Sequence, residues 1–266
     1  MRMKRVIVLV ACLLFGAAVA VGAQETPIAK AEADYRFQFD LYRTAYQSYQ
    51  VNKAEYLKSG TLKAEQEALE AAKEASLARA DVLRTHTQWL RLQLLETSPI
   101  YLRSSELADR LDQLSQSYLA DKSKINAAGD KTEFESVQAE YTTALPQRER
   151  LIAQSQIELK LAKLALFREE IMRLYEPLIP ILTTHQQIPE VEQGMTRVAT
   201  NFDDLNARIQ TLSENAKVLE STDIRTTRND PATVNRTTTK ELESLRQLIL
   251  NTISILSELE ARYGQP

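Results

Sequence analysis

Apolar and aromatic side chains recur along this chain in alternating steps of three and four residues. The longest such series, near the start of the chain, contains Tyr35, Phe39, Tyr42, Tyr46, Tyr49, Lys53 and Tyr56. A second series runs from Leu107 to Tyr118, and a third runs from Leu242 to Leu259. Side chains with this spacing share one face of an α-helix. The pattern therefore predicts several helices, each with a stripe that packs against a neighbour.

Glycine, proline and polar turn residues divide the chain into six predicted helices. Their expected ranges are about 27–58, 61–97, 99–127, 131–176, 189–220 and, from a start between 232 and 240, up to 262. Residues 178–182 are apolar and interrupted by a proline, and we expect them to close one end of a bundle. Residues 221–240 are polar and rich in turn-forming residues, which indicates a loop or a frayed helix end.

Local signals mark several of the predicted helix ends. Gly60 is free to adopt a left-handed conformation that ends the first helix, and the Thr61 hydroxyl can accept a backbone N–H at the start of the second. Asp130, followed three residues later by Glu133, has the spacing of a capping box. Pro146 lies inside the fourth predicted helix, where we expect it to kink or interrupt the helix.

The residue content favours helices over strands throughout the chain. Only four glycines follow residue 23, and alternating strand patterns are missing, whereas Ala, Leu, Glu, Lys, Gln and Arg are abundant. We therefore expect an all-α fold, an elongated, coiled-coil-like bundle of about six helices. Its helices are expected to pair as antiparallel hairpins at 24–98, 99–186 and 187–266.

The first 23 residues have the layout of an export signal. Three basic residues within the first five positions precede eighteen uncharged, mostly apolar residues, and small side chains end the stretch at Ala23. We expect cleavage after Ala23. Two alternatives stay open: residues 6–23 are also long enough for an uncleaved membrane anchor, and residues 9–12 resemble a lipoprotein signal that ends in a lipid-modified Cys12. Against the lipoprotein reading, residues 13–15 are apolar where a polar linker is normal.

The charge and cysteine content narrow the classes of partner. Beyond residue 23 the chain has 30 basic and 36 acidic residues, with no long run of Lys or Arg, so we expect no nucleic-acid partner. Cys12 is the only cysteine, which excludes disulfides and thiolate ligands from the part after the signal. We expect an exported protein located in the periplasm, at the cell surface or outside the cell. Contact with a membrane is expected only through residues 6–23, if they are not removed.

Catalytic motifs are not found in this sequence. His86 and His185 are the only histidines, and neither has the spacing of a zinc-binding or di-iron helix. Glu169 and Arg173 are four residues apart, the ordinary spacing of a solvated pair within a helix. The chain contains no nucleophile elbow, phosphate-binding glycine loop or calcium loop. We therefore expect no enzymatic activity, no metal site and no cofactor.

Seven of the seventeen aromatic residues lie between Tyr35 and Tyr56. A tight turn at Gly60 would bring position i of the first helix close to position 120 − i of the second, so that Tyr49 faces Ala71 and its neighbours. Large rings then pack onto small side chains, and this interpretation as hairpin core is the one we prefer. Part of the stripe is alternatively an open groove for a partner helix or peptide, and a platform for sugars or nucleotides is a third interpretation. The groove would comprise Tyr35, Phe37, Phe39, Tyr42, Tyr46 and Tyr49.

The order of motifs between Tyr35 and Leu95 resembles a known group of sequences. After the spaced tyrosines come the pairs Tyr56-Leu57, Thr61-Leu62, Ala68-Leu69 and Val82-Leu83, and then the stretch from Leu90 to Leu95. This order is similar to that of uncharacterised exported, long-helix proteins of candidate-phylum bacteria. The resemblance covers about a quarter of the chain and rests on helix-packing positions. It implies a location in the bacterial envelope and no assigned activity or site residues.

These observations favour a non-catalytic protein. We expect an exported helical scaffold or interaction module of the bacterial cell envelope, with a protein partner or self-association. The alternative is a soluble peptide-binding protein or holdase-type chaperone that grips a partner between its helical hairpins.

Overall fold

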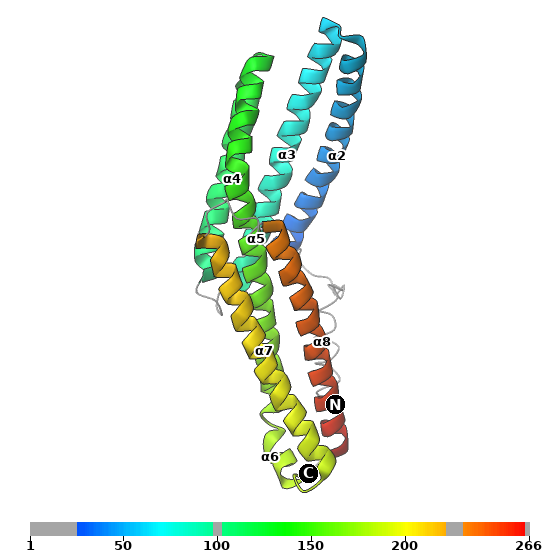
Figure 1. The fold of residues 1–266 in the computed structure, drawn as a ribbon, viewed down its shortest axis with the longest axis vertical. Coiled ribbons are helices and arrows are strands. Elements are labelled where there is room, and N and C mark those ends of the chain that lie inside the picture. Colours follow the sequence, from blue (N-terminus) through cyan, green and yellow to red (C-terminus); the bar gives the residue numbers. More distant parts are fainter. Residues whose placement is uncertain (1–25, 98–102, 222–230, 264–266) are drawn as a thin grey trace. The chain divides into compact units, whose positions relative to one another are not determined.

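The computed structural model describes residues 26–97, 103–221 and 231–263, and these residues form seven helices and no strand (Figure 1). The prediction of an all-α fold is thereby confirmed. The helices are α2 (Pro27–Ser59), α3 (Leu62–Thr97), α4 (Arg103–Ala127), α5 (Lys131–Tyr175), α6 (Ile179–Thr184), α7 (Pro189–Ser221) and α8 (Pro231–Tyr263).

The helix α6 is the main difference from the six predicted helices. It is a short helix of 6 residues with a proline in its first turn, within the stretch that the sequence marked only as apolar. Proline is tolerated there because the first helical N–H groups have no partner inside the helix. The expected export signal at 1–23 and residues 222–230 of the expected polar loop lie outside the described residues. Residues 231–240, the second half of that expected loop, belong to α8, so the loop prediction is wrong for them.

The turn between α2 and α3 has the predicted chemistry. Gly60 has φ 61°, a left-handed conformation, and its N–H donates to the carbonyl oxygen of Tyr56 at 2.9 Å. The hydroxyl of Thr61 accepts from the backbone N–H of Ala64 at 3.2 Å, which caps the start of α3. Because the connection is so short, α3 must fold back along α2.

The capping signals at the start of α5 are also observed. The Asp130 carboxylate accepts from the backbone N–H of Glu133 at 2.9 Å, and the Glu133 carboxylate accepts in return from the N–H of Gly129 at 2.6 Å. These bonds satisfy N–H groups that a helix start leaves without partners. The helix then continues through Pro146, so the expected interruption does not occur.

The chain divides into two compact units, residues 25–159 and residues 160–266, and the helix α5 contributes to both. The division into three separate hairpins stays a prediction.

In the unit formed by residues 25–159, α3 is the central helix. It packs against α2 and α4, and it is bonded to α5 by a 2.8 Å ion pair between Glu65 and Lys131. A second ion pair, of 2.6 Å, joins Asp81 of α3 to Lys122 of α4. Since α3 contacts three helices, its buried side chains lie on more than one face.

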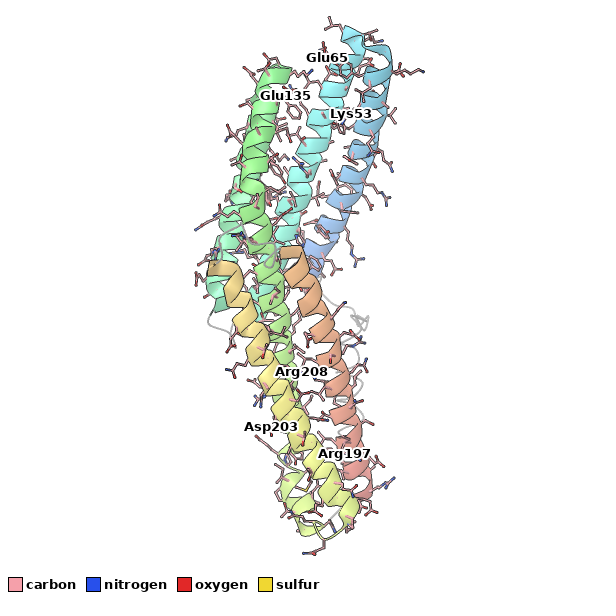
Figure 2. All side chains as sticks on the ribbon, viewed as in Figure 1. Lys53, Glu65, Glu135, Arg197, Asp203 and Arg208 are labelled. Carbon is pink, nitrogen blue, oxygen red and sulfur yellow. The ribbon has the colours of Figure 1, made fainter. Side chains whose placement is uncertain are left out.

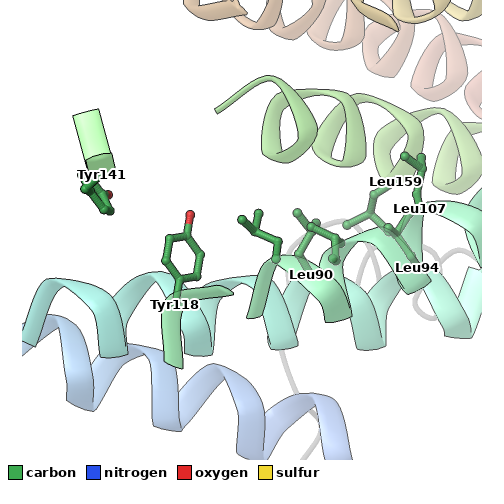
Figure 3. Packing of buried hydrophobic residues seen from close by; sticks show 8 residues of the cluster. Leu90, Leu94, Leu107, Tyr118, Tyr141 and Leu159 are labelled. Carbon is green, nitrogen blue, oxygen red and sulfur yellow. The ribbon is translucent and has the colours of Figure 1, made fainter. Parts of the chain in front are cut away.

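The core of this unit lies between α3, α4 and α5 (Figure 3). The predicted series from Leu107 to Tyr118 is buried there along its whole length, together with Leu90 and Leu94 of α3. Tyr141 and Leu159 of α5 complete the cluster. The second heptad-like series of the sequence is thus a true core stripe.

A partly polar cluster joins α4 to α5 beside this core. The Arg148 guanidinium forms an ion pair with Asp121, and both side chains are largely buried. The same guanidinium lies 5.0 Å from the ring centre of Tyr118 and 5.2 Å from that of Tyr141. Burial raises the pKa of both tyrosines, because the charged phenolate would lose its hydration.

In the unit formed by residues 160–266, α7 and α8 lie antiparallel. The Asn201 amide donates to the Thr252 hydroxyl at 3.0 Å, and the Arg208 guanidinium, labelled in Figure 2, donates to the Ser244 hydroxyl at 2.9 Å. The third predicted series is buried on α8. Its described and buried members are Leu245, Ile249, Thr252, Leu256 and Leu259.

The buried Gly194 allows α7 and α8 to approach closely. A Cβ atom at this position would lie 3.0 Å from both methyl carbons of Leu259. We expect Gly194→Val to destabilise the protein by about 1–3 kcal/mol, because the added methyl groups overpack the helix contact. Chemical denaturation measures this change in the free energy of unfolding. The matched control is Ala199→Val at an exposed position of α7, which carries only the helix-propensity cost of about 0.5 kcal/mol; equal losses for both variants would contradict the contact.

Candidate functional site

The aromatic series on α2 differs from the other two series because it is not enclosed. In α2 only Ala45 is buried, whereas α3 buries a whole row of small residues. That row includes Ala64, Ala68, Ala71, Ala75 and Ala80. The helix α2 therefore lies on the outside of its unit, with α3 beneath it.

The register between α2 and α3 agrees with the one predicted from the turn at Gly60. The rings of Tyr35 and His86 are 5.2 Å apart, and Tyr46 lines the same cavity as Ala75. The residue numbers in each of these two pairs add up to 121. The predicted register required a sum of 120, so the observed register differs from it by one residue. The bulky side chains before the turn thus lie over the small ones after it.

A groove of about 210 Å³ lies between α2, α3 and α5. Small side chains of α3, those of Ala72, Ala75 and Ser76, line it from below. Its other lining residues are Tyr42, Tyr46 and Tyr49 of α2, Phe134 and Gln138 of α5, and Arg79 of α3. We call this feature the aromatic groove. It exists because two helices flank α3 while the alanines between them are too small to fill the space.

The three tyrosines form one continuous aromatic wall. Ring centres are 5.8 Å apart for Tyr42 and Tyr46, and 6.1 Å apart for Tyr46 and Tyr49. Tyr46 is 41% exposed, so this wall is open to solvent. The rings lie over the alanines as the preferred interpretation expects, but Tyr46 is not enclosed in the way that a core residue would be.

Arg79 carries the charge of the aromatic groove. Its Nη2 donates to the side-chain oxygen of Gln138 at 3.1 Å, and its guanidinium lies 4.1 Å from the ring centre of Tyr141. These contacts hold the group between α3 and α5. The lining residues include no carboxylate, so the groove combines apolar rings with one positive charge.

The remaining predicted groove residues lie elsewhere on α2. Tyr35 stacks on Trp89 with ring centres 5.7 Å apart and planes 13° apart, and it lies 6.3 Å from Phe39. Phe37 is 62% exposed and lies off the stripe. Of the six residues expected to form one groove, three line the aromatic groove, Tyr35 and Phe39 belong to a second aromatic cluster, and Phe37 belongs to neither.

His86 belongs to the second cluster, and its burial gives stability a pH dependence. Burial lowers the pKa of His86 below the 6.5 of the unfolded chain, because the imidazolium loses its hydration. The unfolded state then binds the proton more readily than the folded state. We expect the free energy of unfolding to keep its full value, as far as His86 is concerned, above pH 6.5. It should fall as the pH drops below that value, because the unfolded state then takes up the proton first. Denaturation of wild type and His86→Phe between pH 5.5 and 7.5 measures it; parallel pH profiles would contradict the assignment.

The charged pair near the end of α5 differs from the one that the residue spacing indicated. Arg173 pairs with Glu170 at 2.7 Å, in place of the Glu169 that the spacing indicated, and both side chains are solvated. His185 lies 6.0 Å from the ring of Tyr263. Within residues 26–97, 103–221 and 231–263, no group of three or more His, Cys, Asp or Glu residues is arranged to hold a metal ion. No helix in this part of the chain is both long and apolar enough to span a bilayer.

The far side of the aromatic groove was not predictable from the sequence. Arg79, Phe134 and Gln138 come from α3 and α5, and α5 is separated from α2 by two helices. The only signal was Phe134 directly after the capping box, where an apolar residue in the first turn of a helix often contacts a neighbouring element. The spacing of residues within α5 does not indicate which residues lie across the groove from Phe134.

Comparisons with known proteins give no relative for this chain. The resemblance of residues 35–95 to exported long-helix proteins therefore stays a hypothesis. No protein family, no curated protein and no solved structure matches the sequence or the fold.

Proposed function

We propose that this chain is a non-catalytic protein-interaction module of the bacterial cell envelope, and that its aromatic groove receives a segment of a partner protein. Export is part of the proposal and rests on residues 1–23 of the sequence. The groove supplies the recognition surface, and the helices around it hold that surface in place.

The proposal rests on one observation: the three tyrosine rings lie next to one another, and the wall that they form is open to solvent. Aromatic rings bury large areas on contact with a partner, and their hydroxyl groups offer hydrogen bonds at the rim. The side chains of Tyr42, Tyr46 and Tyr49 are already ordered by packing on α3 and on one another. A ligand therefore meets a preformed surface and loses less entropy on binding.

Photo-crosslinking from within the groove tests the proposal. A benzoylphenylalanine side chain replaces Tyr46 in the full chain, and the producing cells are irradiated. We expect one discrete cross-linked protein. The same group placed at the exposed Gln47 of α2 is the matched control, and we expect no such product from it.

A groove-filling variant shows whether the product depends on the groove. We expect Ala72→Met, which places a longer side chain in the groove, to abolish the cross-link at position 46. Equal cross-linking from positions 46 and 47, or a product that survives Ala72→Met, would contradict the proposed site.

A second candidate function is that of a holdase-type chaperone. It is favoured by the large apolar side chains that α2 and the first residue of α3 expose beyond the groove. These are Phe37, Phe39, Leu41, Val51, Leu57 and Leu62. Unfolded chains expose apolar side chains of their own, and burial of these against such residues is favourable. Suppression of the aggregation of an unrelated unfolding protein, lost in a Phe37→Ser/Leu41→Ser variant, tests this function; no suppression would exclude it.

A further inference from the structure

The charges at the aromatic groove identify the chemistry of its ligand. Arg79 differs from the other arginines of α2 and α3, each of which has a carboxylate partner. Those four are Arg36, Arg43, Arg84 and Arg91. Among the described residues no carboxylate pairs with Arg79, and its buried Nε has no hydrogen-bond acceptor.

A second cation lies at the other end of the tyrosine wall. The ammonium group of Lys53, an exposed residue of α2 labelled in Figure 2, is 5.6 Å from the ring centre of Tyr49. Within the described part of the chain it has no acidic partner either. The tyrosine wall therefore has Arg79 near one end and Lys53, which does not itself line the groove, near the other, although acidic residues outnumber basic ones in the whole chain. This charge pattern is complementary to a ligand with two negative groups.

The distance between the two cations sets the distance between the two negative groups of the ligand. In the observed register Arg79 lies opposite Tyr42, and the helix between Tyr42 and Lys53 is about 16 Å long at 1.5 Å per residue. An extended chain covers this length in roughly five residues. The groove of about 210 Å³ exceeds the ~150 Å³ that suffices for benzene in an apolar cavity, so it has room for one aromatic side chain.

We propose that the aromatic groove binds an extended acidic segment of a partner protein, in which one aromatic side chain enters the groove and two carboxylates about five residues apart pair with Arg79 and Lys53. This inference rests on the proposed function and deepens it by naming the ligand. The aromatic side chain stacks against the tyrosine wall, and the carboxylates supply the missing counter-ions of the two cations.

Two hexapeptides test the inference by calorimetric titration of the full chain. Both are capped at each end and contain tryptophan at the third position. One has aspartate at positions one and six, and the other has asparagine there. We expect the aspartate peptide to bind at least about tenfold more tightly, a factor that corresponds to one charge-assisted contact, and to weaken as salt is added.

Variants assign the effect to the two cations. We expect Arg79→Gln and Lys53→Gln each to lower the affinity for the aspartate peptide about tenfold, while Lys58→Gln, at an exposed lysine of the same helix, leaves it unchanged. Thermal melting of Arg79→Gln checks that the loss is not unfolding, since Arg79 also contacts Tyr141. Lys53→Gln is free of this complication because its side chain is exposed.

Several outcomes would overturn the inference. Equal affinity for the two peptides would refute the acidic ligand and leave the groove as a partner site, to be judged by the cross-link at position 46. Binding that ignores both charge variants would place the peptide elsewhere. No binding of either peptide at millimolar concentration, or a dimer that the same variants dissociate, would refute the peptide ligand, the latter in favour of a second copy of this chain.

Discussion

Leu111→Ala is expected to lower the free energy of unfolding by about 3 kcal/mol. Leu111 is 0% exposed and lies within the leucine and tyrosine core between α3, α4 and α5. Truncation removes buried carbon atoms and leaves a cavity that a packed helix bundle closes only in part, and such substitutions typically cost about 2–5 kcal/mol. Urea denaturation followed by circular dichroism measures the change.

The matched control for this prediction lies on the same helix. Leu119 belongs to α4 as well but is 40% exposed, so Leu119→Ala is expected to change stability by less than about 0.5 kcal/mol. Similar losses of stability for Leu111→Ala and Leu119→Ala would show that α4 does not turn its Leu111 side toward the core.

Asp121→Ala is expected to cost about 3 kcal/mol, the second large effect. The ion pair of Asp121 with Arg148 joins α4 to α5, and the two side chains are only 14% and 13% exposed. Removal of the carboxylate leaves a guanidinium among the rings of Tyr118 and Tyr141 without its counter-ion, and an unpaired buried charge is strongly destabilising. Chemical denaturation at low and high salt measures the loss, which should be nearly independent of salt because the pair is shielded from solvent.

A solvated pair between the same two helices is the control. Lys124 and Glu140 also connect α4 to α5, but they are 53% and 59% exposed. We expect Glu140→Ala to leave stability almost unchanged and to have no effect at high salt, because the pair is solvated. If Glu140→Ala were as costly as Asp121→Ala, burial would not be what distinguishes the two pairs.

Local signals were sufficient to predict the long helices, but not α6, and one contact between helices. Gly60 and Thr61 determine both the end of α2 and the start of α3, and a connection this short fixes how the two helices face each other. The register of Tyr46 over Ala75 follows from that alone. The burial of the series from Leu107 to Tyr118 could also be predicted, because its spacing matches one helix face and its side chains are apolar or aromatic.

The openness of the aromatic groove was not accessible from the sequence. Heptad spacing shows which side chains share a face, but not whether a third helix covers that face. On α3 the face is covered by α4 and α5, whereas on α2 nothing within the described residues encloses Tyr46. The position of Gln138 beside Arg79 likewise depends on how α5 packs against α3. Because α4 lies between these two helices in the sequence, the same apolar spacing is compatible with many arrangements of α5 on α3.

The solvent accessibility of Tyr46 tests the central claim most directly. A 3-fluorotyrosine is placed at position 46 or at position 118, and its fluorine resonance is recorded with a soluble paramagnetic agent. We expect strong broadening at position 46 and little at Tyr118, which is 1% exposed. We further expect the aspartate hexapeptide to protect position 46. Equal protection of both positions in the free protein would mean that the tyrosine wall is closed, and there would be no groove for a partner to enter.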